Sequence, residues 1–370
     1  MKILYEKTLR TILYLCKFVG IINMSYVLQS DGLLIQNTDS LYKCLEISRM
    51  IILIILSYSI CTKAEFFYIL HVLKLWTVII TSRISESRLM NGIIEYDQKL
   101  TSLPRFLLIR QLSLKKNYWN IIFIFTLIYY TAMTSALLYL FPPKSIDIIV
   151  IAVYFIRLEF VTDLSVIFSS YFFLKQLEYR FKMLNYSWKY LQPGFLNIPS
   201  ELTDSITEMT LDKMRLLHAE LSDLLRIFSD SYGKVILGFF IFTYIDMLVI
   251  FFFMITSHKK TKEKNILTSV VKTFLPYCYQ LNNVICILSI VIVASRVHEK
   301  KRKMISHLRL IRISNLSAKL KLQVKLFMNQ ITVLESSEIT AFGVFNINLN
   351  LVVSILILLV TGFVTIIQMQ

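Results

Sequence analysis

Ionisable and phenolic side chains interrupt apolar segments of this 370-residue sequence. An ionised group at the centre of a bilayer costs about 3 kcal/mol on insertion scales, so such groups usually face a ligand, a cavity or one another. Helical spacing places Glu159 and Asp163 on one face and Arg157 on another. The candidate ligand-pocket residues are Tyr154, Arg157, Glu159, Asp163, Tyr244 and Asp246. They either line a polar pocket or form buried pairs that lock helices, and the sequence favours neither.

Uncharged polar residues form a second group near the C-terminus. Thr361, Thr365 and Gln368 recur at steps of four and three, which places them on one face of a helix. Taken alone, hydroxyl and amide groups in an apolar helix most often form hydrogen bonds to neighbouring helices.

The sequence contains no motif typical of a catalytic site, a metal site or a nucleic-acid-binding surface. The five cysteines show no CxxC spacing, the histidines are isolated, and no GxGxxG, phosphate-binding loop or GxSxG occurs. The net charge is +16. The Lys and Arg residues that produce it lie beside apolar segments and do not form a soluble basic patch with exposed aromatic residues. We therefore expect no enzyme activity, no metal, no cofactor and no nucleic-acid partner.

The elements that must position these residues follow from composition. The chain is 56% hydrophobic and 17% charged, with 8 Gly and 6 Pro, which is too apolar for ordinary soluble domains. Long Ile/Leu/Phe runs favour membrane helices over barrel strands, which would alternate polar and apolar residues. The sequence predicts an all-α membrane protein with seven transmembrane helices. The predicted spans are 41–60, 64–82, 118–141, 146–174, 233–256, 267–295 and 341–367.

Lys and Arg predict the orientation. The segment before residue 40 and connections 83–117, 175–232 and 296–340 together hold 28 of them, whereas the remaining connections hold 6. Because cytoplasmic loops carry the excess of Lys and Arg, the N-terminus is predicted to be cytoplasmic and the C-terminus extracellular. The basic run at 300–303 is also suited to contact anionic lipid heads of the bilayer.

Two of these connections are themselves helical in pattern. Apolar residues recur at steps of three and four in 206–228 and 316–334, so the membrane helices are expected to continue into the cytoplasm and pack there. The second stripe includes Leu320, Val324, Phe327 and Ile331, which form either an ordinary packing face or an oligomer anchor.

The C-terminal segment resembles the last helix of insect gustatory receptors, whose signature begins TxxGxFxxN and finishes TYxxxxxQF. Thr340, Gly343, Phe345 and Asn346 or Asn348 fit the start, and Thr361 and Gln368 keep the spacing of the finish. Gly362 replaces the Tyr of the motif and Met369 replaces the Phe. Similar stretches occur at 180–185, at 216–240 and around 327–331.

The resemblance implies a ligand-gated, non-selective cation channel that detects a tastant. It implies a homo- or heterotetramer of gustatory receptor subunits in the plasma membrane, multi-pass, on dendrites of gustatory neurons. The expected organisation is a cytoplasmic segment at 1–40, six spans within 41–295 with long cytoplasmic loops at 83–117 and 175–232, anchor helices at 296–340, and a pore-lining helix at 341–370.

By position, the resemblance places Thr361, Thr365, Gln368 and Met369 near the narrow outer end of the pore. Hydroxyl and amide groups can replace part of an ion's hydration, and an apolar ring can close a pore by dewetting. A membrane transporter or a metabotropic seven-helix receptor is the alternative function.

Overall fold

The computed structural model describes residues 2–29, 33–63, 66–82, 86–101, 119–140, 142, 157–191, 200–258, 266–309, 318–335 and 339–368. Almost all of them are helical. The helices are α1 (Lys2–Val19), α2 (Ser40–Lys63), α3 (Phe66–Ser82), α4 (Glu86–Leu100), α6 (Trp119–Leu140), α8 (Leu158–Leu191), α9 (Ser200–His258), α10 (Ile266–Arg309), α11 (Ala318–Glu335) and α12 (Leu349–Gln368). The strands are β1 (Tyr26–Leu28), β2 (Leu34–Gln36), β3 (Thr340–Ala341) and β4 (Phe345–Asn346).

Each predicted span overlaps one of these helices, so the helical class is confirmed. Within the described residues, α6, α9, α10 and α12 are long and apolar enough to cross a membrane, and α3 is a shorter apolar helix. The count of seven spans and the orientation stay predictions. The strands form two short antiparallel hairpins, β1–β2 and β3–β4, which the sequence pattern did not predict.

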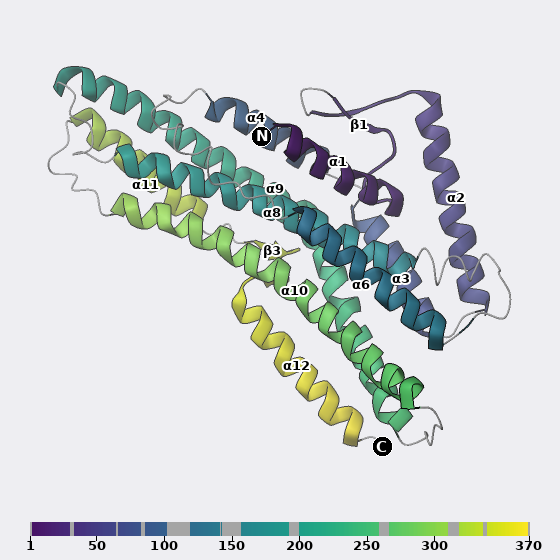
Figure 1. The fold of residues 1–370 in the computed structure, drawn as a ribbon. Coiled ribbons are helices and arrows are strands. Elements are labelled where there is room, and N and C mark those ends of the chain that lie inside the picture. The colour runs from purple at the N-terminus through teal and green to yellow at the C-terminus, as the bar shows by residue number, and fades with distance from the viewer. Residues whose placement is uncertain are drawn as a thin grey trace.

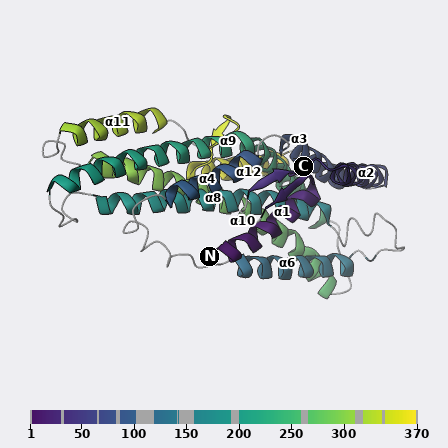
Figure 2. The ribbon, with the colours of Figure 1, turned by 90° about the horizontal axis from the view of Figure 1, so that it is seen from above.

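Two helices greatly exceed the length that a bilayer requires. A span needs about 20 residues, whereas α9 has 59 and α10 has 44. The amphipathic segment 206–228 and the apolar segment 233–256 are parts of the single helix α9. Figures 1 and 2 show α8, α9 and α10 side by side, with α11 at one end of the molecule and α2 at the other.

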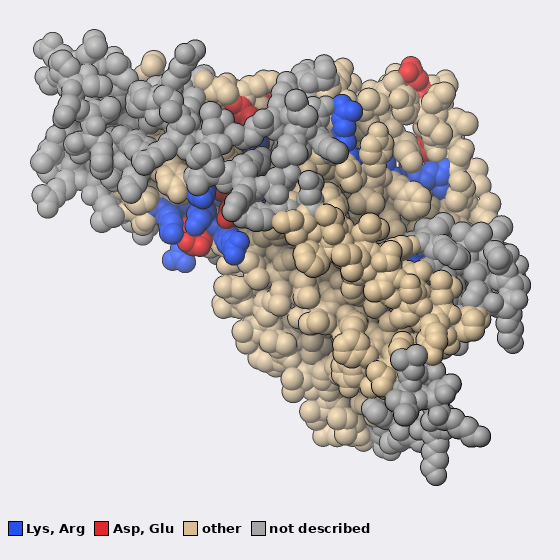
Figure 3. All heavy atoms as spheres, viewed as in Figure 1, with Lys and Arg blue, Asp and Glu red and all other residues tan. Residues whose placement is uncertain are grey.

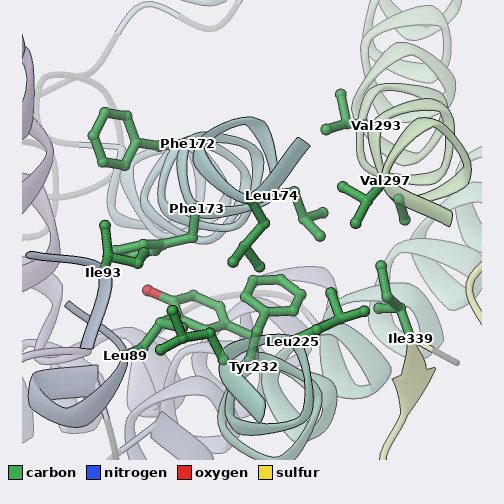
Figure 4. Close-up of a cluster of buried hydrophobic side chains, with 14 of the residues drawn as sticks. Leu89, Ile93, Phe172, Phe173, Leu174, Leu225, Tyr232, Val293, Val297 and Ile339 are labelled. Atoms are coloured by element: carbon green, nitrogen blue, oxygen red, sulfur yellow. The ribbon is translucent and has the colours of Figure 1, made fainter. Parts of the chain in front are cut away.

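The hydrophobic core joins helices that are far apart in the sequence. Figure 4 shows Leu89 of α4, Phe173 of α8, Tyr232 of α9, Val297 of α10 and Ile339, which precedes β3, in one cluster. Burial of each large apolar side chain contributes roughly 1.5–3 kcal/mol. This core fixes α8, α9 and α10 relative to one another.

The N-terminal helix α1 packs against α8. The hydroxyl of Ser165, within the predicted fourth span, donates hydrogen bonds to the Leu15 and Val161 carbonyls, and the Cys16 thiol lies 3.9 Å from the Ser165 carbonyl oxygen. The helix α1 therefore packs against α8 at this level, and the cytoplasmic placement of 1–40 stays a prediction.

The last helix begins later than predicted. Thr340 pairs with Asn346, and Phe342 and Gly343 at the turn have φ angles of 53° and 72°. This left-handed turn cannot continue a right-handed helix. The helix α12 therefore starts at Leu349, where the side chain of Asn348 accepts a hydrogen bond from the Leu351 amide at 3.2 Å.

Charge is unevenly distributed on the surface. On the face in Figure 3, described Lys and Arg residues gather away from the lower part of the molecule, where α12 and one end of α10 lie. That lower part shows no described charged residue in this view. An uncharged band of this kind is what contact with lipid hydrocarbon requires.

Candidate functional site

Lys74 of α3 lies at the centre of a buried charged cluster. Its side-chain nitrogen is 2.6 Å from Asp163 Oδ1 on α8 and 3.9 Å from Asp246 Oδ2 on α9. It also lies 3.3 Å from the Thr243 hydroxyl, and His71 Nδ1 lies 3.8 Å from Asp246 Oδ2. Side-chain exposures of 2% for Lys74 and 1% for Asp246 show that water does not screen these pairs.

A second ion pair adjoins this cluster. Arg157, which directly precedes α8, is only 3% exposed, and its Nε lies 3.4 Å from Glu159 Oε1. Its φ angle of 46° is rare for a residue with a side chain and costs of order 1 kcal/mol. Among the described residues, the Arg157 Nη1 atom has no hydrogen-bond partner.

The acids of the combined cluster outnumber its permanent cations. Glu159, Asp163 and Asp246 face Lys74 and Arg157, and neither carboxylate oxygen of Asp246 accepts a hydrogen bond from a described residue. The difference is one negative charge, which a proton or a cationic group would neutralise. The cluster can therefore lock α3, α8 and α9 together and can also respond to charge.

The predicted ligand-pocket set divides in the structure. Asp163 and Asp246 meet through Lys74, whereas the Tyr244 hydroxyl points to α12 and donates a hydrogen bond to the Leu358 carbonyl at 3.1 Å. Tyr154 lies outside the described residues, and so does Met369 of the predicted pore set.

Sequence reasoning missed two members of the cluster. His71 and Lys74 interrupt the predicted second span, and a charge within an apolar segment is itself the signal of a functional or paired residue. Within the described part of the chain, no group of three or more His, Cys, Asp or Glu side chains is placed to hold a metal ion.

The proposed pore face of α12 is exposed on the isolated chain. Thr361, Thr365 and Gln368 are all exposed, and each threonine hydroxyl donates a hydrogen bond to a carbonyl one turn earlier in its own helix. These residues lie away from the side of α12 that includes the buried Leu359. The hydrogen bonds that both threonine hydroxyls donate therefore stay within α12.

The start of the C-terminal motif forms the β3–β4 turn. Ser229 of α9 accepts a hydrogen bond from the Thr340 amide at 3.0 Å, and the Thr340 hydroxyl accepts one from the Gly343 amide at 3.2 Å. A Cβ atom at Gly233 would lie 2.7 Å from the Phe342 nitrogen. Close backbone approach at Gly233 thus attaches the start of α12 to α9.

The predicted oligomer anchor lies inside the subunit. Leu320, Val324, Phe327 and Ile331 of α11 are at most 7% exposed, and the Phe327 ring contacts the rings of Trp188 and His218. These four side chains form a packing face within one chain, so they are not available to another subunit. The large apolar side chains of α11 that are exposed, among those described, are Leu322, Leu326 and Val333.

A buried histidine lies in the part of α9 predicted to extend beyond the membrane. His218 is fully buried between aromatic rings of α8 and α11. Desolvation by burial, and then the positive charge of Lys301, lowers the pKa of His218 to about 4. The folded protein therefore holds this imidazole neutral at physiological pH.

Comparisons with known proteins agree with this architecture. The profile of the family described as 7tm Chemosensory receptor matches residues 9–370. No curated protein sequence matches. The olfactory receptor OR5 of the insect Machilis hrabei is similar in fold, at a TM-score of 0.60 in complex with eugenol and 0.61 in a second structure. The identities are 13% and 12%, over 99% and 98% of this chain and 100% and 98% of those chains.

Proposed function

The chain belongs to the 7tm chemosensory receptor family, and on this premise we propose that it is a gustatory receptor subunit, a ligand-gated channel that conducts cations when a tastant binds. The C-terminal motif supports taste over smell, because its start and its Thr361 to Gln368 spacing resemble gustatory receptors. The protein acts as a signalling channel in the plasma membrane of sensory dendrites and catalyses no reaction.

The observation that carries this proposal is the exposed polar face of α12. Thr361, Thr365 and Gln368 stand on a helix that carries no charged residue along its 20 residues. The threonine hydroxyls bond within α12, but lipid would offer no partner to the Gln368 amide, whereas in a tetramer this face would line a water-filled pore. Uncharged oxygen and amide groups suit a pore that admits several cations.

Assembly supplies the missing sides of this pore. Four subunits, identical or from related receptors, place their α12 helices around one axis, with Met369 near the outer end. At the opposite end, we place the subunit contact on the exposed stripe of α11 and not on the four buried residues. That stripe consists of Leu322, Leu326 and Val333.

The ligand binds near the cluster of Arg157 and Glu159. The Arg157 guanidinium has an unused donor among the described residues, and its local backbone strain marks the kind of position that binding sites often use. Asp163 and Asp246, held by Lys74, position the helices on either side. A ligand opens the channel only through a higher affinity for the open state.

The test is recording from excised membrane patches that contain the full-length protein. A panel of sugars, bitter compounds, amines and organic acids is applied without nucleotide or G protein. Reversible cation current that one compound evokes would support the proposal. Responses that require cytosol indicate a metabotropic receptor, and substrate uptake without ligand-gated current indicates a transporter; either result overturns it.

A further inference from the structure

The phenol of Tyr244 connects α9 to the helix that we assign to the pore. Its hydroxyl donates a hydrogen bond to the Leu358 carbonyl at 3.1 Å. In a helix, this carbonyl is also the acceptor of the Gly362 amide four residues later. The phenol therefore attaches to the backbone of α12 one turn before Gly362.

Gly362 leaves the space that this contact occupies. A Cβ atom at Gly362 would lie 3.3 Å from the Tyr244 oxygen and 2.7 Å from Leu248 Cδ2. A larger residue would displace both side chains of α9. Glycine also weakens a helix by roughly 1 kcal/mol relative to alanine, so α12 is most easily bent here.

The contact lies on α9 at the same level as the Lys74 cluster, on the opposite side of the helix. Tyr244 and Asp246 are two residues apart, and residues at this spacing point to opposite sides of a helix. One side of α9 thus meets the Lys74 cluster, and the other meets α12 at the same level. A shift of α9 caused at the cluster would reach α12 directly.

The rest of α12 is held to α9 at other points. Ser229 fixes the preceding β3–β4 hairpin, and the Phe251 and Phe363 rings lie 3.9 Å apart between centroids. The Tyr244 contact lies between these two attachments, directly before the turns that carry the polar pore face. Of these three attachments, the Tyr244 contact is the hydrogen bond that lies within the apolar segments of both α9 and α12.

We propose that Tyr244 is a positioning residue for the gate: through its bond to Leu358 beside Gly362, it sets the angle of the outer turns of α12 according to the position of α9. This role rests on the proposed channel function. The bond is stronger in one state of the gate than in the other, and Tyr244 thereby converts ligand binding into pore opening.

The experiment compares Tyr244→Phe with wild type in ligand-evoked and ligand-independent current. Removal of one neutral hydrogen bond is expected to shift the half-maximal ligand concentration or the resting open fraction by about two- to tenfold. Ion selectivity and surface level should stay as in wild type. The matched control is Tyr58→Phe, which removes an exposed hydroxyl of α2. A shift no larger than in the control, or a loss of current that follows surface level alone, would overturn the proposal.

A double-mutant cycle locates the effect. Gly362→Ala should displace the phenol, so Tyr244→Phe should add little in that background, because both substitutions act on one contact. Independent, additive shifts would contradict the assignment.

Hydrogen exchange of the purified full-length receptor gives a readout that needs no current. Tyr244→Phe should accelerate exchange of α12 amides around Gly362 and leave α8 unchanged. Faster exchange with no ligand-gated current in wild type would remove the channel function but keep the contact. Unchanged exchange would remove the inference whatever the current shows.

Discussion

The helices α8 and α12 both overlap predicted membrane spans, yet they differ sharply in how far the rest of the chain covers them. Side chains of α8 are buried on almost every side, by α1, α3, α9 and α10, and its Asp163 is paired with Lys74. Leu359 is the only buried residue of α12 among its described residues. The helix α9 gives a second comparison. In its span-length apolar segment 44% of the residues are buried, whereas in that of α12 only 6% are.

The difference in burial suggests that α8 serves mainly to stabilise the subunit, whereas α12 serves mainly its function. The subunit itself fixes α8, through close packing and through charges that cannot be left alone in an apolar interior. By contrast, α12 is fixed at a few contacts, and the rest of the subunit leaves most of its surface uncovered. Substitutions in the cluster should therefore change folding, whereas substitutions on the exposed face of α12 should change conduction.

The largest effect is expected for Lys74→Met. This change leaves Asp163 and Asp246 buried without their cation, which typically costs 3–5 kcal/mol. Folded receptor at the cell surface should fall strongly, as measured by surface labelling and thermal unfolding in detergent.

The control for Lys74→Met is Lys99→Met, which breaks the exposed pair with Glu220. A surface pair contributes at most about 1 kcal/mol, so this variant should remain close to wild type. Equal losses in both variants would contradict the claim that burial makes the difference.

A smaller effect is expected from acid at His218. Its folded pKa of about 4 lies below the ordinary value of 6.5, so the unfolded chain binds the proton first as pH falls. Stability is complete above pH 6.5 and declines as pH approaches 4, by at most about 3 kcal/mol.

His218→Leu should remove this part of the acid sensitivity. Thermal unfolding at pH 7.5 measures the packing change alone, and the same measurement at pH 5 adds the proton. If wild type and variant lose the same stability between these two pH values, His218 is not the group responsible.

Arg157→Ala tests whether the Arg157–Glu159 ion pair binds the ligand or locks the helices together. If Arg157 contacts the ligand, the half-maximal concentration should rise by roughly tenfold or more, because a hydrogen bond to a charged group contributes about 1.5–3 kcal/mol. Calcium imaging of a dose series measures this shift. Loss of surface delivery in place of a shift would assign the pair to helix locking.

The smallest effect on stability is expected for Gln368→Ala. The side chain is exposed, so the free energy of unfolding should change by less than about 0.5 kcal/mol. Conductance or ion selectivity should nevertheless change, because the amide is expected to face the permeating ion. Unchanged single-channel currents from correctly surfaced receptors would remove Gln368 from the pore.

Much of the fold could be predicted because its signals are local. Runs of apolar residues predicted a helix at each of the proposed spans, and the three- and four-residue spacing predicted α11. The turn before α12 was missed, since Thr340 to Asn348 reads as apolar and helical until Ser229 and Gly233 of α9 are known to hold it.

The C-terminal motif by itself indicated the family. Composition and spacing determined the helical class and the energetic cost of each charge in an apolar segment, because they are properties of neighbouring residues. Tertiary structure alone decided which charges meet, that Lys74 joins Asp163 to Asp246, that Tyr244 turns to α12, and that the stripe of α11 is internal. Those outcomes depend on contacts between residues up to about 170 positions apart along the chain, as for Lys74 and Thr243 with a separation of 169. Side-chain periodicity identifies a face of a helix but not the partner that covers it.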